Sequence, residues 1–409
     1  MQNKKIEKIK LGFIGLGQRG PGLASNVLNN FKDVDIVAVC DVYADRVDAE
    51  AEKVKNSRGY EPKKYTDYND LLNDENVNVV IISASWEAHI PLAIASMKAK
   101  KITALEVGGA YALDDCYKLV KAYEETKTPF MFLENCCYGK KELLVTSLVR
   151  KNKMGEVTYC SGAYGHDLRG EICGGLKNRH YRLRNYLIRN CDNYPTHELG
   201  PIAKLLNINR GNRMLSLVSM SSKARGLHEY VQDKPEYEFL KDKHFMQGDV
   251  VQTLITCADG TLISLKLDTT QPRAYSREFA VRGTKGYYSE LGNTLLIEGD
   301  DYNHEHDVEE YINNVNKYDE YLPQIWKDIT PEKIEAGHGG MDTLMFESFF
   351  EAVKNGDEMP IDVYDAAAWM AITCLSESSI SRGGVPVEIP DFTDGEWIMR
   401  EPKDVCDLK

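Results

Sequence analysis

Side chains that can donate and accept protons gather in four short segments of the second half of the chain. The segments are SGAYGHDLRG, HYRLRNYLIRN, NYPTHELGP and TTQPRAYSREF, and their candidate residues are Tyr164, Arg182, Tyr194, His197 and Tyr275. Pro195 and Thr196 are typical of a helix start, so Tyr194 and His197 could converge on one site. Phenol and imidazole groups suit general acid and base catalysis. Taken one at a time, each tyrosine is equally well explained as a half-buried core aromatic, and His197 as a structural histidine.

A glycine-rich turn follows the first apolar run. LGFIGLGQRG places Gly15, Gly17 and Gly20 directly after the predicted strand Ile9–Ile14 and at the start of a helical pattern. Glycines at this spacing permit a tight turn and a close approach to a pyrophosphate, which the helix N-terminus stabilises. Asp41, after the next predicted strand, can accept hydrogen bonds from ribose hydroxyls and repel a 2′-phosphate. The pattern predicts a site for NAD rather than NADP; turn glycines and a surface aspartate are the alternative.

Three further segments, SASWEAH, LEVGG and LENCCYG, follow other predicted strands of the first half. In a parallel sheet flanked by helices, the cofactor lies beyond the carboxyl ends of the strands, where these segments fall. Taken alone, Trp86 is more often a packing residue and Asn135 a turn residue.

A regular framework must position these segments. In residues 1–135, apolar runs occur at Ile9–Ile14, Ile36–Cys40, Val77–Ile82, Ile102–Leu105 and Phe130–Leu133. Helical patterns lie between them at Gly22–Asn30, Asp45–Lys55, Ala88–Lys98 and Leu113–Thr126. Strands that are apolar on both faces and joined by helices predict an α/β fold, a doubly wound parallel sheet with helices on each side. We expect residues 1–140 to form this dinucleotide-binding (Rossmann) domain.

The pattern changes after Glu142–Lys151, which we interpret as a linking helix. Strand-like stretches follow at residues 157–165, 214–221, 249–257, 261–268, 278–283 and 286–297, and helices return at Met341–Lys354 and Val363–Ser381. Asp259 and Gly260 mark a hairpin turn, after which apolar and polar residues alternate, so that this sheet has one solvated face. Residues 141–409 are therefore expected to form an α+β substrate-binding domain with a mostly antiparallel, open-faced sheet whose face carries the substrate. The polar stretch Asp300–Tyr321 is expected to be a surface excursion.

Composition excludes several classes of protein. The chain has 409 residues, 43% of them hydrophobic, and its formal net charge of −13 argues against nucleic-acid binding. No stretch of about 18 uninterrupted apolar residues is present, so no membrane span is expected. Ten dispersed cysteines without C-x-x-C predict buried thiols rather than a disulfide framework. As given, the chain is expected in the cytoplasm; a periplasmic or secreted protein would need a signal segment that has been removed. A homo-oligomer is compatible with the sequence. We predict no metal site, since His304 and His306 lie in an acidic run without a nearby cysteine.

Together these motifs resemble the Gfo/Idh/MocA oxidoreductase family and, more closely, glycoside hydrolase family 109, which comprises NAD-dependent retaining N-acetylhexosaminidases. The resemblance runs over nearly the whole chain, from GLGQRG through LENCCYG, AYGHDLR and YPTH to GHGGMD and GGVPVEIPDF. It implies cofactor contacts at Gln18, Arg19, Asp41, Trp86 through His89, Glu106, Val107 and Asn135. It implies substrate contacts at Tyr164, Arg182, Tyr194, His197 and Tyr275. The implied substrate is an amino sugar, free or at a glycan terminus, with α-N-acetylgalactosamine as our first expectation.

The implied chemistry uses NAD as a temporary electron sink. Hydride leaves C3 of the sugar, the resulting ketone acidifies the C2 proton, and loss of that proton expels the C1 substituent. Water then adds at C1 and the hydride returns, so NAD stays bound through turnover. We assign Tyr164 as a general base, place His197 and Tyr194 at the C3 hydroxyl, and let Arg182 and Tyr275 orient the sugar. These groups are expected to gather around the nicotinamide ring.

Other interpretations stay open. An NAD-dependent sugar or polyol dehydrogenase of the Gfo/Idh/MocA type is the main alternative, although that family tends to carry Glu-Lys-Pro where this chain has Val107 after Glu106, and valine cannot relay a proton. A catalytically silent sugar-binding protein would leave the polar cluster unassembled. We interpret Asp167 as an ion-pair partner of Arg169. The chain departs from the family pattern at Gly108, where proline is usual, and at Glu198, where glycine is usual.

Overall fold

The computed structural model describes residues 5–300 and 308–408. They form two compact units. Unit 1 comprises Met1–Asn135 and Ile329–Ala367, and unit 2 comprises Cys136–Asp328 and Ala368–Lys409. His304 and His306 lie outside the described residues. None of the described helices is long and apolar enough to cross a membrane.

Unit 1 is built on a parallel sheet of six strands in the order β3-β2-β1-β4-β5-β6. The strands are β1 (Ile9–Ile14), β2 (Val34–Cys40), β3 (Lys63–Tyr65), β4 (Val79–Ile82), β5 (Ile102–Leu105) and β6 (Phe130–Phe132). Every residue of β4, β5 and β6 is buried, because helices cover both faces of such a sheet. The predicted doubly wound parallel sheet is confirmed. Successive strands are added to one side of β1 up to β3 and then to its other side from β4 onward, so the order of strands changes direction between β1 and β4. Sheets of this kind bind ligands at that point, beyond the carboxyl ends of the two strands.

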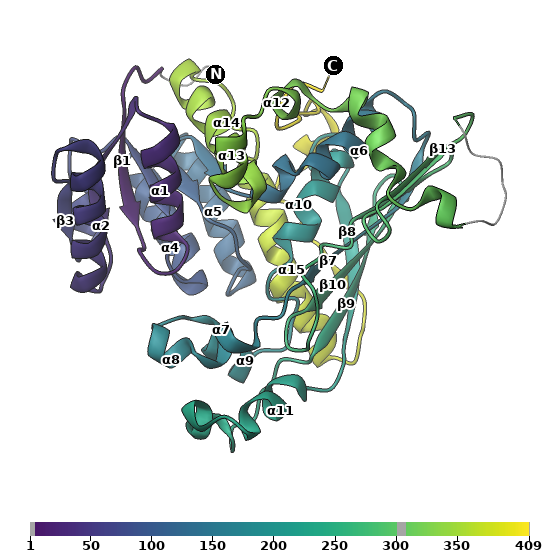
Figure 1. Ribbon diagram of the computed structural model, residues 1–409, viewed down its shortest axis with the longest axis horizontal. Helices are drawn as coiled ribbons and strands as arrows, with labels where there is room; N and C mark the ends of the chain where they lie inside the picture. The colour runs from purple at the N-terminus through teal and green to yellow at the C-terminus, as the bar shows by residue number, and fades with distance from the viewer. Residues whose placement is uncertain (1–4, 301–307, 409) are drawn as a thin grey trace. The chain divides into compact units, whose positions relative to one another are not determined.

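The helices of unit 1 connect successive strands, and a later segment of the chain adds to them. The connecting helices are α1 (Gly20–Asn30), α2 (Ala44–Arg58), α3 (Tyr68–Leu72), α4 (Trp86–Lys98) and α5 (Leu113–Thr126). The later segment contains α13 (Pro331–Glu335), the 3-10 turn η5 (His338–Gly340) and α14 (Met341–Asn355). Figure 1 shows α14 alongside α1, and the ring of Phe350 meets that of Phe31 edge to face at 5.0 Å. Burial of these aromatic rings fixes α14 on unit 1.

Unit 2 contains an eight-stranded sheet in the order β13-β12-β11-β7-β10-β9-β8-β14. The strands are β7 (Val157–Gly165), β8 (Met214–Ser221), β9 (Val250–Cys257), β10 (Leu262–Asp268), β11 (Ala280–Gly283), β12 (Gly286–Ser289), β13 (Thr294–Ile297) and β14 (Val387–Glu388). The strands pair antiparallel except β7 with β10. The predicted turn at Asp259 and Gly260 is present, with Gly260 at φ +89°. The mostly antiparallel sheet is therefore confirmed.

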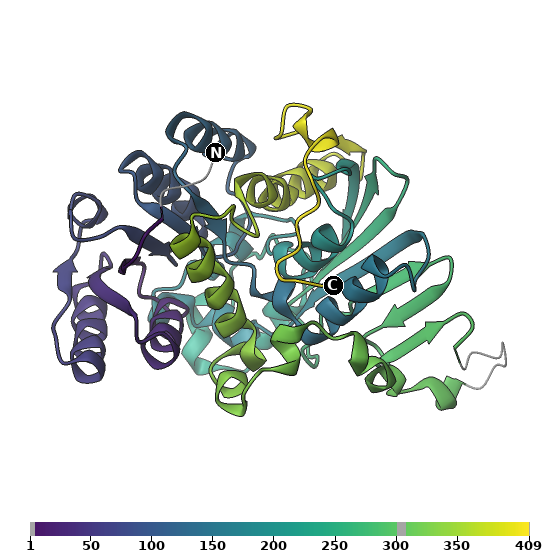
Figure 2. The ribbon, with the colours of Figure 1, turned by 90° about the horizontal axis from the view of Figure 1, so that it is seen from above.

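Helices pack on one face of this sheet (Figures 1 and 2). The helices and 3-10 turns of unit 2 are η1 (Asn135–Tyr138, of which Asn135 belongs to unit 1), α6 (Lys140–Arg150), α7 (Arg169–Cys173), α8 (Gly175–Asn178), α9 (Arg182–Ile188), α10 (Thr196–Leu205), α11 (Gly226–Gln232), η2 (Pro235–Leu240), η3 (Val308–Tyr311), η4 (Asn314–Tyr321), α12 (Gln324–Lys327), η6 (Glu396–Ile398) and, across both units, α15 (Val363–Ser381). In β10, Ile263, Leu265 and Leu267 are buried and alternate with more accessible residues. That alternation agrees with the predicted solvated face.

Two local predictions were wrong, and three short helices were missed. Residues 286–297 form two strands rather than one, because Gly292 and Asn293 take positive φ and reverse the chain between them. The described part of Asp300–Tyr321 is not a simple surface excursion: Val315 is buried and the Asn314 side chain bonds to the backbone of Leu295. The short helices α7 to α9 were not predicted, since each has seven residues or fewer and little periodicity. The ten cysteines are free thiols, eight of them buried, as expected.

Candidate functional site

The glycine loop of unit 1 joins β1 to α1 with little room for side chains. Gly15 has a φ of +95°, and a Cβ there would lie 2.5 Å from the backbone nitrogen of Ala84. A Cβ on Gly20 would lie 2.2 Å from the carbonyl oxygen of Gly15. Gly17 is partly exposed, and within the described chain a Cβ there would first meet the Arg46 guanidinium at 3.5 Å. The first turn of α1 carries no acidic side chain, so the loop fits a pyrophosphate.

Asp41 is held beside this loop at the end of β2. Its Oδ2 accepts a hydrogen bond from the backbone N–H of Leu16 at 2.7 Å, and its Oδ1 accepts one from that of Tyr43 at 3.0 Å. Arg46 Nη1 lies 3.7 Å from Oδ2. The carboxylate is thus fixed by the backbone next to the glycines, and its remaining lone pairs suit ribose hydroxyls. Gln18 is exposed within the same loop.

Trp86 and His89 lie in the first turn of α4, and both are buried. A Cβ on Gly108 would lie 2.3 Å from Trp86 Cδ1, so the indole packs directly against the backbone of Gly108. This contact explains why glycine, rather than a residue with a side chain, stands at position 108. His89 Nε2 lies 3.0 Å from the carbonyl oxygen of Ala84, and burial lowers the pKa of His89 to about 4. His89 is therefore neutral near pH 7.

Two other predicted cofactor residues, Arg19 and Asn135, meet at the carboxylate of Asp342, and Arg19 also binds Glu106. Arg19 donates to both oxygens of Asp342 at 2.7 and 2.8 Å, and Asn135 Nδ2 donates to Asp342 Oδ1 at 2.7 Å. Arg19 Nε also donates to Glu106 Oε1 at 2.9 Å, while Glu106 Oε2 accepts the N–H of the buried Val107 at 3.0 Å. The other members of this group were predicted from the sequence, but Asp342 was not. The motif GHGGMD, which ends at Asp342, could have drawn attention to this residue, although the motif alone assigns it no chemical role.

Unit 2 brings the three predicted catalytic side chains together. The ring of Tyr164, near the end of β7, lies 4.5 Å from the ring of Tyr194 and 5.6 Å from that of His197, centroid to centroid. The rings of Tyr194 and His197 are 4.9 Å apart. Tyr194 precedes α10 and His197 is the second residue of that helix, so the helix start turns both side chains toward β7. A catalytically silent protein was expected to leave these side chains apart, whereas in unit 2 they are in contact.

Arg182 completes the cluster from the start of α9. Its guanidinium carbon lies 5.0 Å from the centre of the Tyr194 ring, and its Nε is 2.6 Å from Glu171 Oε1. Burial raises the pKa of Tyr164 above its usual range, and the nearby Arg182 charge opposes this rise. Tyr164 is therefore a neutral phenol at pH 7, and Arg182 lowers the free energy of its ionised form. Glu171 was missed because the helix α7 that positions it was not predicted.

His166 lies next to Tyr164 and was named in the polar segment but not selected. Its Nδ1 is 3.4 Å from the Tyr164 hydroxyl oxygen, a separation that often shortens when substrate binds. Burial lowers the pKa of His166 and the charge of Arg182 adds to this effect, while the nearby carboxylates of Glu171 and Asp167 oppose it. A neutral imidazole in this place can accept a proton from Tyr164. The spacing of two residues between Tyr164 and His166 was a weak sign that the two side chains are neighbours, since residues two apart on a strand share one face.

Tyr275 lies at the edge of the cluster. Its ring is 5.2 Å from that of His166, and 49% of the residue is exposed. Arg277 Nη1 donates to the Tyr275 hydroxyl at 3.4 Å, while Arg277 Nε donates to Glu142 Oε1 at 2.9 Å. An exposed phenol held by an arginine can contact a ligand without being part of the buried group. The five predicted substrate residues are thus neighbours within unit 2.

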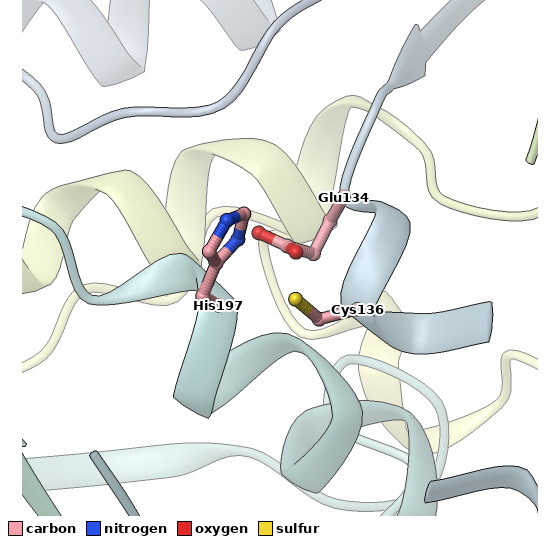
Figure 3. Close-up of side chains that lie close together, drawn as sticks. All are labelled: Glu134, Cys136 and His197. Carbon is pink, nitrogen blue, oxygen red and sulfur yellow. The ribbon is translucent and has the colours of Figure 1, made fainter. Parts of the chain in front are cut away.

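Cys136 adds a thiol to this group. Figure 3 shows Cys136, on η1, and His197, at the start of α10, directed toward the same space, with the sulfur and a ring nitrogen within 4.8 Å. Glu134, which the figure also labels, lies two residues before Cys136 and belongs to unit 1. The vicinal thiols of Cys136 and Cys137 were expected to be buried, and they are. Cys136 and His197 would supply a soft metal ion with two ligands from this unit.

The cluster lies on the helix-covered face of the sheet rather than on the solvated face that was expected to carry the substrate. Gly162 and Tyr164 share one face of β7, and a Cβ on Gly162 would lie 2.8 Å from Glu198 Cβ on α10. The helix therefore packs directly on the strand, and Glu198 is buried there. Asp167 pairs with Arg169 at 2.7 Å, as predicted.

The two parts of the chain match known families separately. Residues 9–133 match the family described as "Oxidoreductase family, NAD-binding Rossmann fold", and residues 138–399 match "Glycosyl hydrolase 109, C-terminal domain".

Known proteins resemble the whole chain. An α-N-acetylgalactosaminidase of Tannerella forsythia is 38% identical, covering 96% of this chain and 88% of its own. One of Shewanella oneidensis is 34% identical, with coverage of 97% and 88%. A levoglucosan dehydrogenase in complex with NADH has a similar structure, with a TM-score of 0.68 over 94% of this chain and 100% of its own at 17% identity. That likeness shows the fold alone.

Proposed function

Because this chain belongs to glycosyl hydrolase family 109, a family of NAD-dependent glycoside hydrolases, we propose that it is a retaining α-N-acetylgalactosaminidase that keeps NAD bound through turnover. The observation that carries this proposal is the assembly of Tyr164, Tyr194 and His197 in contact with one another. The identity to two α-N-acetylgalactosaminidases supports the choice of sugar. The NAD-binding Rossmann domain and the fit of its glycine loop and Asp41 support the choice of cofactor.

The cofactor would be held by Gly15, Gly17 and Gly20 at the pyrophosphate and by Asp41 at the ribose. When bound, NAD supplies a hydride acceptor that oxidises a secondary alcohol reversibly. Trp86, Glu106 and their neighbours would hold the rest of the cofactor. Val107 is buried and apolar, so the proton of the sugar hydroxyl must go to another residue, which disfavours a lysine-dependent dehydrogenase.

The phenol and imidazole groups of unit 2 would move the protons. We assign His197 and Tyr194 to the C3 hydroxyl, where His197 accepts the proton as the hydroxyl is oxidised. Tyr164 takes the C2 proton, and because its pKa is raised, it passes its own proton to Nδ1 of His166 in the same step. Arg182 stabilises the partial charge on the Tyr164 oxygen during this transfer.

Two further residues would hold the sugar in place. Arg182 and the exposed Tyr275 orient the ring through its hydroxyl groups. Tyr164 and Tyr194 are 5% and 7% exposed, so little water reaches these two side chains.

The test uses the purified protein and nitrophenyl α-N-acetylgalactosaminide without added cofactor. Nitrophenolate release with no lasting NADH absorbance supports the proposal, provided that NAD is recovered from the denatured protein. Stoichiometric accumulation of NADH with free sugars would instead identify a sugar or polyol dehydrogenase. Absence of both signals, with no recoverable nucleotide, would leave a sugar-binding protein. The β-anomer and the N-acetylglucosaminide serve as matched substrates for specificity.

A further inference from the structure

Asp342 is the most heavily hydrogen-bonded carboxylate near the glycine loop. It lies in the first turn of α14, in the segment that joins unit 1 from the far end of the sequence. Its side chain is 3% exposed. It accepts two hydrogen bonds from Arg19 and one from Asn135, and His338 Nδ1 lies 2.9 Å from Oδ2. Because Arg19 follows β1 and Asn135 follows β6, this one carboxylate ties together two loops that succeed different strands.

The charges of the group explain why the arginine is fixed. Arg19 faces two carboxylates, Glu106 and Asp342, that are both almost fully buried. Although burial favours the neutral acid, hydrogen bonds from Arg19 and His338 hold the pKa of Asp342 well below its usual range. Two parallel N–H···O bonds fix the plane of the guanidinium as well as its position. Arg19 is therefore held by the protein and is not available as a mobile phosphate-binding cation.

The backbone before α14 is shaped to present this carboxylate. Gly337, His338, Gly339 and Gly340 all take positive φ, between +46° and +125°. A Cβ on Gly337 would lie 3.0 Å from Asp342 Oδ2. Such a run is costly for residues other than glycine, so the turn that brings Asp342 to Arg19 depends on this glycine-rich sequence. His338 Nδ1 is also 3.2 Å from Arg19 Nη1 and is half exposed at the edge of the group.

We propose that Asp342 is a positioning residue of the cofactor site: by holding Arg19 and Asn135 it keeps the glycine loop and the loop after β6 in the arrangement that binds NAD. The proposal rests on NAD being the cofactor, as stated under the proposed function. Asp342 acts through Arg19 and Asn135 rather than by touching the nucleotide. Loss of the carboxylate would remove the two-pronged contact of the Arg19 guanidinium and leave that side chain with the single hydrogen bond to Glu106 and the neighbouring His338 ring. The glycine loop would then be freed at one end.

The experiment measures NAD affinity directly. Apo-protein of wild type, Asp342→Ala and Asp342→Asn is titrated with NAD by calorimetry, and the melting temperature of each apo-protein is recorded. We expect Asp342→Ala to weaken NAD binding about tenfold or more, the scale of one lost charge-assisted hydrogen bond. Asp342→Asn keeps the volume of the side chain and should show a smaller loss, and it replaces the alanine variant if that variant does not fold.

The matched control is Asp74→Asn. The side chain of Asp74 is 5% exposed in unit 1 and is bound by Lys63 at 3.0 Å and by the Tyr65 hydroxyl at 3.1 Å. Asp74 lies before β4, at the opposite end of the strands from the glycine loop. This substitution should lower the melting temperature without changing the dissociation constant for NAD. A merely structural role for Asp342 would give the same result as the control.

A double-mutant cycle identifies the route of the effect. If Asp342 acts through Arg19, the variant with both Arg19→Ala and Asp342→Ala should lose little more NAD affinity than Arg19→Ala alone. Unchanged or tighter binding in Asp342→Ala, or fully additive losses in the double variant, would overturn the inference while leaving the proposed function intact. Failure of the wild-type protein to bind NAD at all would overturn both.

Discussion

Replacing Gly162 by alanine tests whether close packing of α10 on β7 sets the geometry of the aromatic cluster. The added Cβ would lie 2.8 Å from Glu198 Cβ and 3.3 Å from both Glu198 Cα and its carbonyl oxygen. A Cβ cannot move without its backbone, so rotation of the Glu198 side chain cannot relieve the contact. An ordinary contact begins at 3.4 Å, and the helix must therefore retreat by about 0.6 Å.

That displacement acts on catalysis because the residues concerned are neighbours. Gly162 is two residues before Tyr164 on the same face of β7, and Glu198 directly follows His197. Moving α10 away therefore separates His197 from Tyr164. A misplacement of about 1 Å can cost about 10²-fold in rate, so we expect kcat to fall about tenfold or more. Overpacking of this kind costs about 1–3 kcal/mol, a fall of a few degrees in melting temperature.

The assay combines nitrophenolate release with thermal unfolding, and the control is Gly170→Ala. Gly170 is an exposed position in α7 whose added Cβ would approach only the Tyr230 hydroxyl, at 3.4 Å, among the described residues. The control should retain wild-type kcat, and both variants should retain NAD, since unit 1 is unaltered. If Gly162→Ala keeps kcat within twofold of wild type, the spacing of strand and helix does not govern the reaction and the reasoning is refuted.

Three other outcomes follow from the same geometry. Tyr164→Phe should lower turnover about 10²-fold or more, the scale of a lost general base, with NAD retained on denaturation; near-normal turnover would remove Tyr164 from the mechanism. Because the pKa of His166 is lowered from 6.5, the midpoint of the acidic decline in kcat/KM should lie below pH 6.5. This decline should be absent from the residual activity of His166→Gln. An unchanged pH profile in that variant would exclude His166 as the proton acceptor. Burial lowers the pKa of His89 to about 4 from 6.5, so the unfolded state binds a proton that the folded state does not between these values. Stability should therefore be fully present above pH 6.5 and fall by about 3 kcal/mol as the pH drops to 4, and denaturant unfolding of His89→Gln should lack this component.

The sequence alone determined the features that depend on neighbours along the chain. Short runs that are apolar on both faces predicted the parallel strands of unit 1. Three glycines after the first strand predicted the tight loop in which Gly15 takes positive φ. Asp259 and Gly260 predicted the hairpin turn, and the alternation of apolar and polar residues after them predicted a solvated face of the sheet. These properties follow from local sterics and from the periods of strands and helices, which a single sequence displays directly.

Tertiary structure decided which distant residues meet. Asp342 reaches Arg19 only because the segment Ile329–Ala367 returns to unit 1 and packs on α1, and nothing in the local pattern of either segment encodes that return. Likewise, Tyr164, Tyr194 and His197 form a cluster because a glycine lets α10 approach β7, which also placed the cluster on the helix-covered face rather than on the solvated one. Contacts of this kind depend on the burial of whole elements against one another, and spacing along the chain carries little information about them.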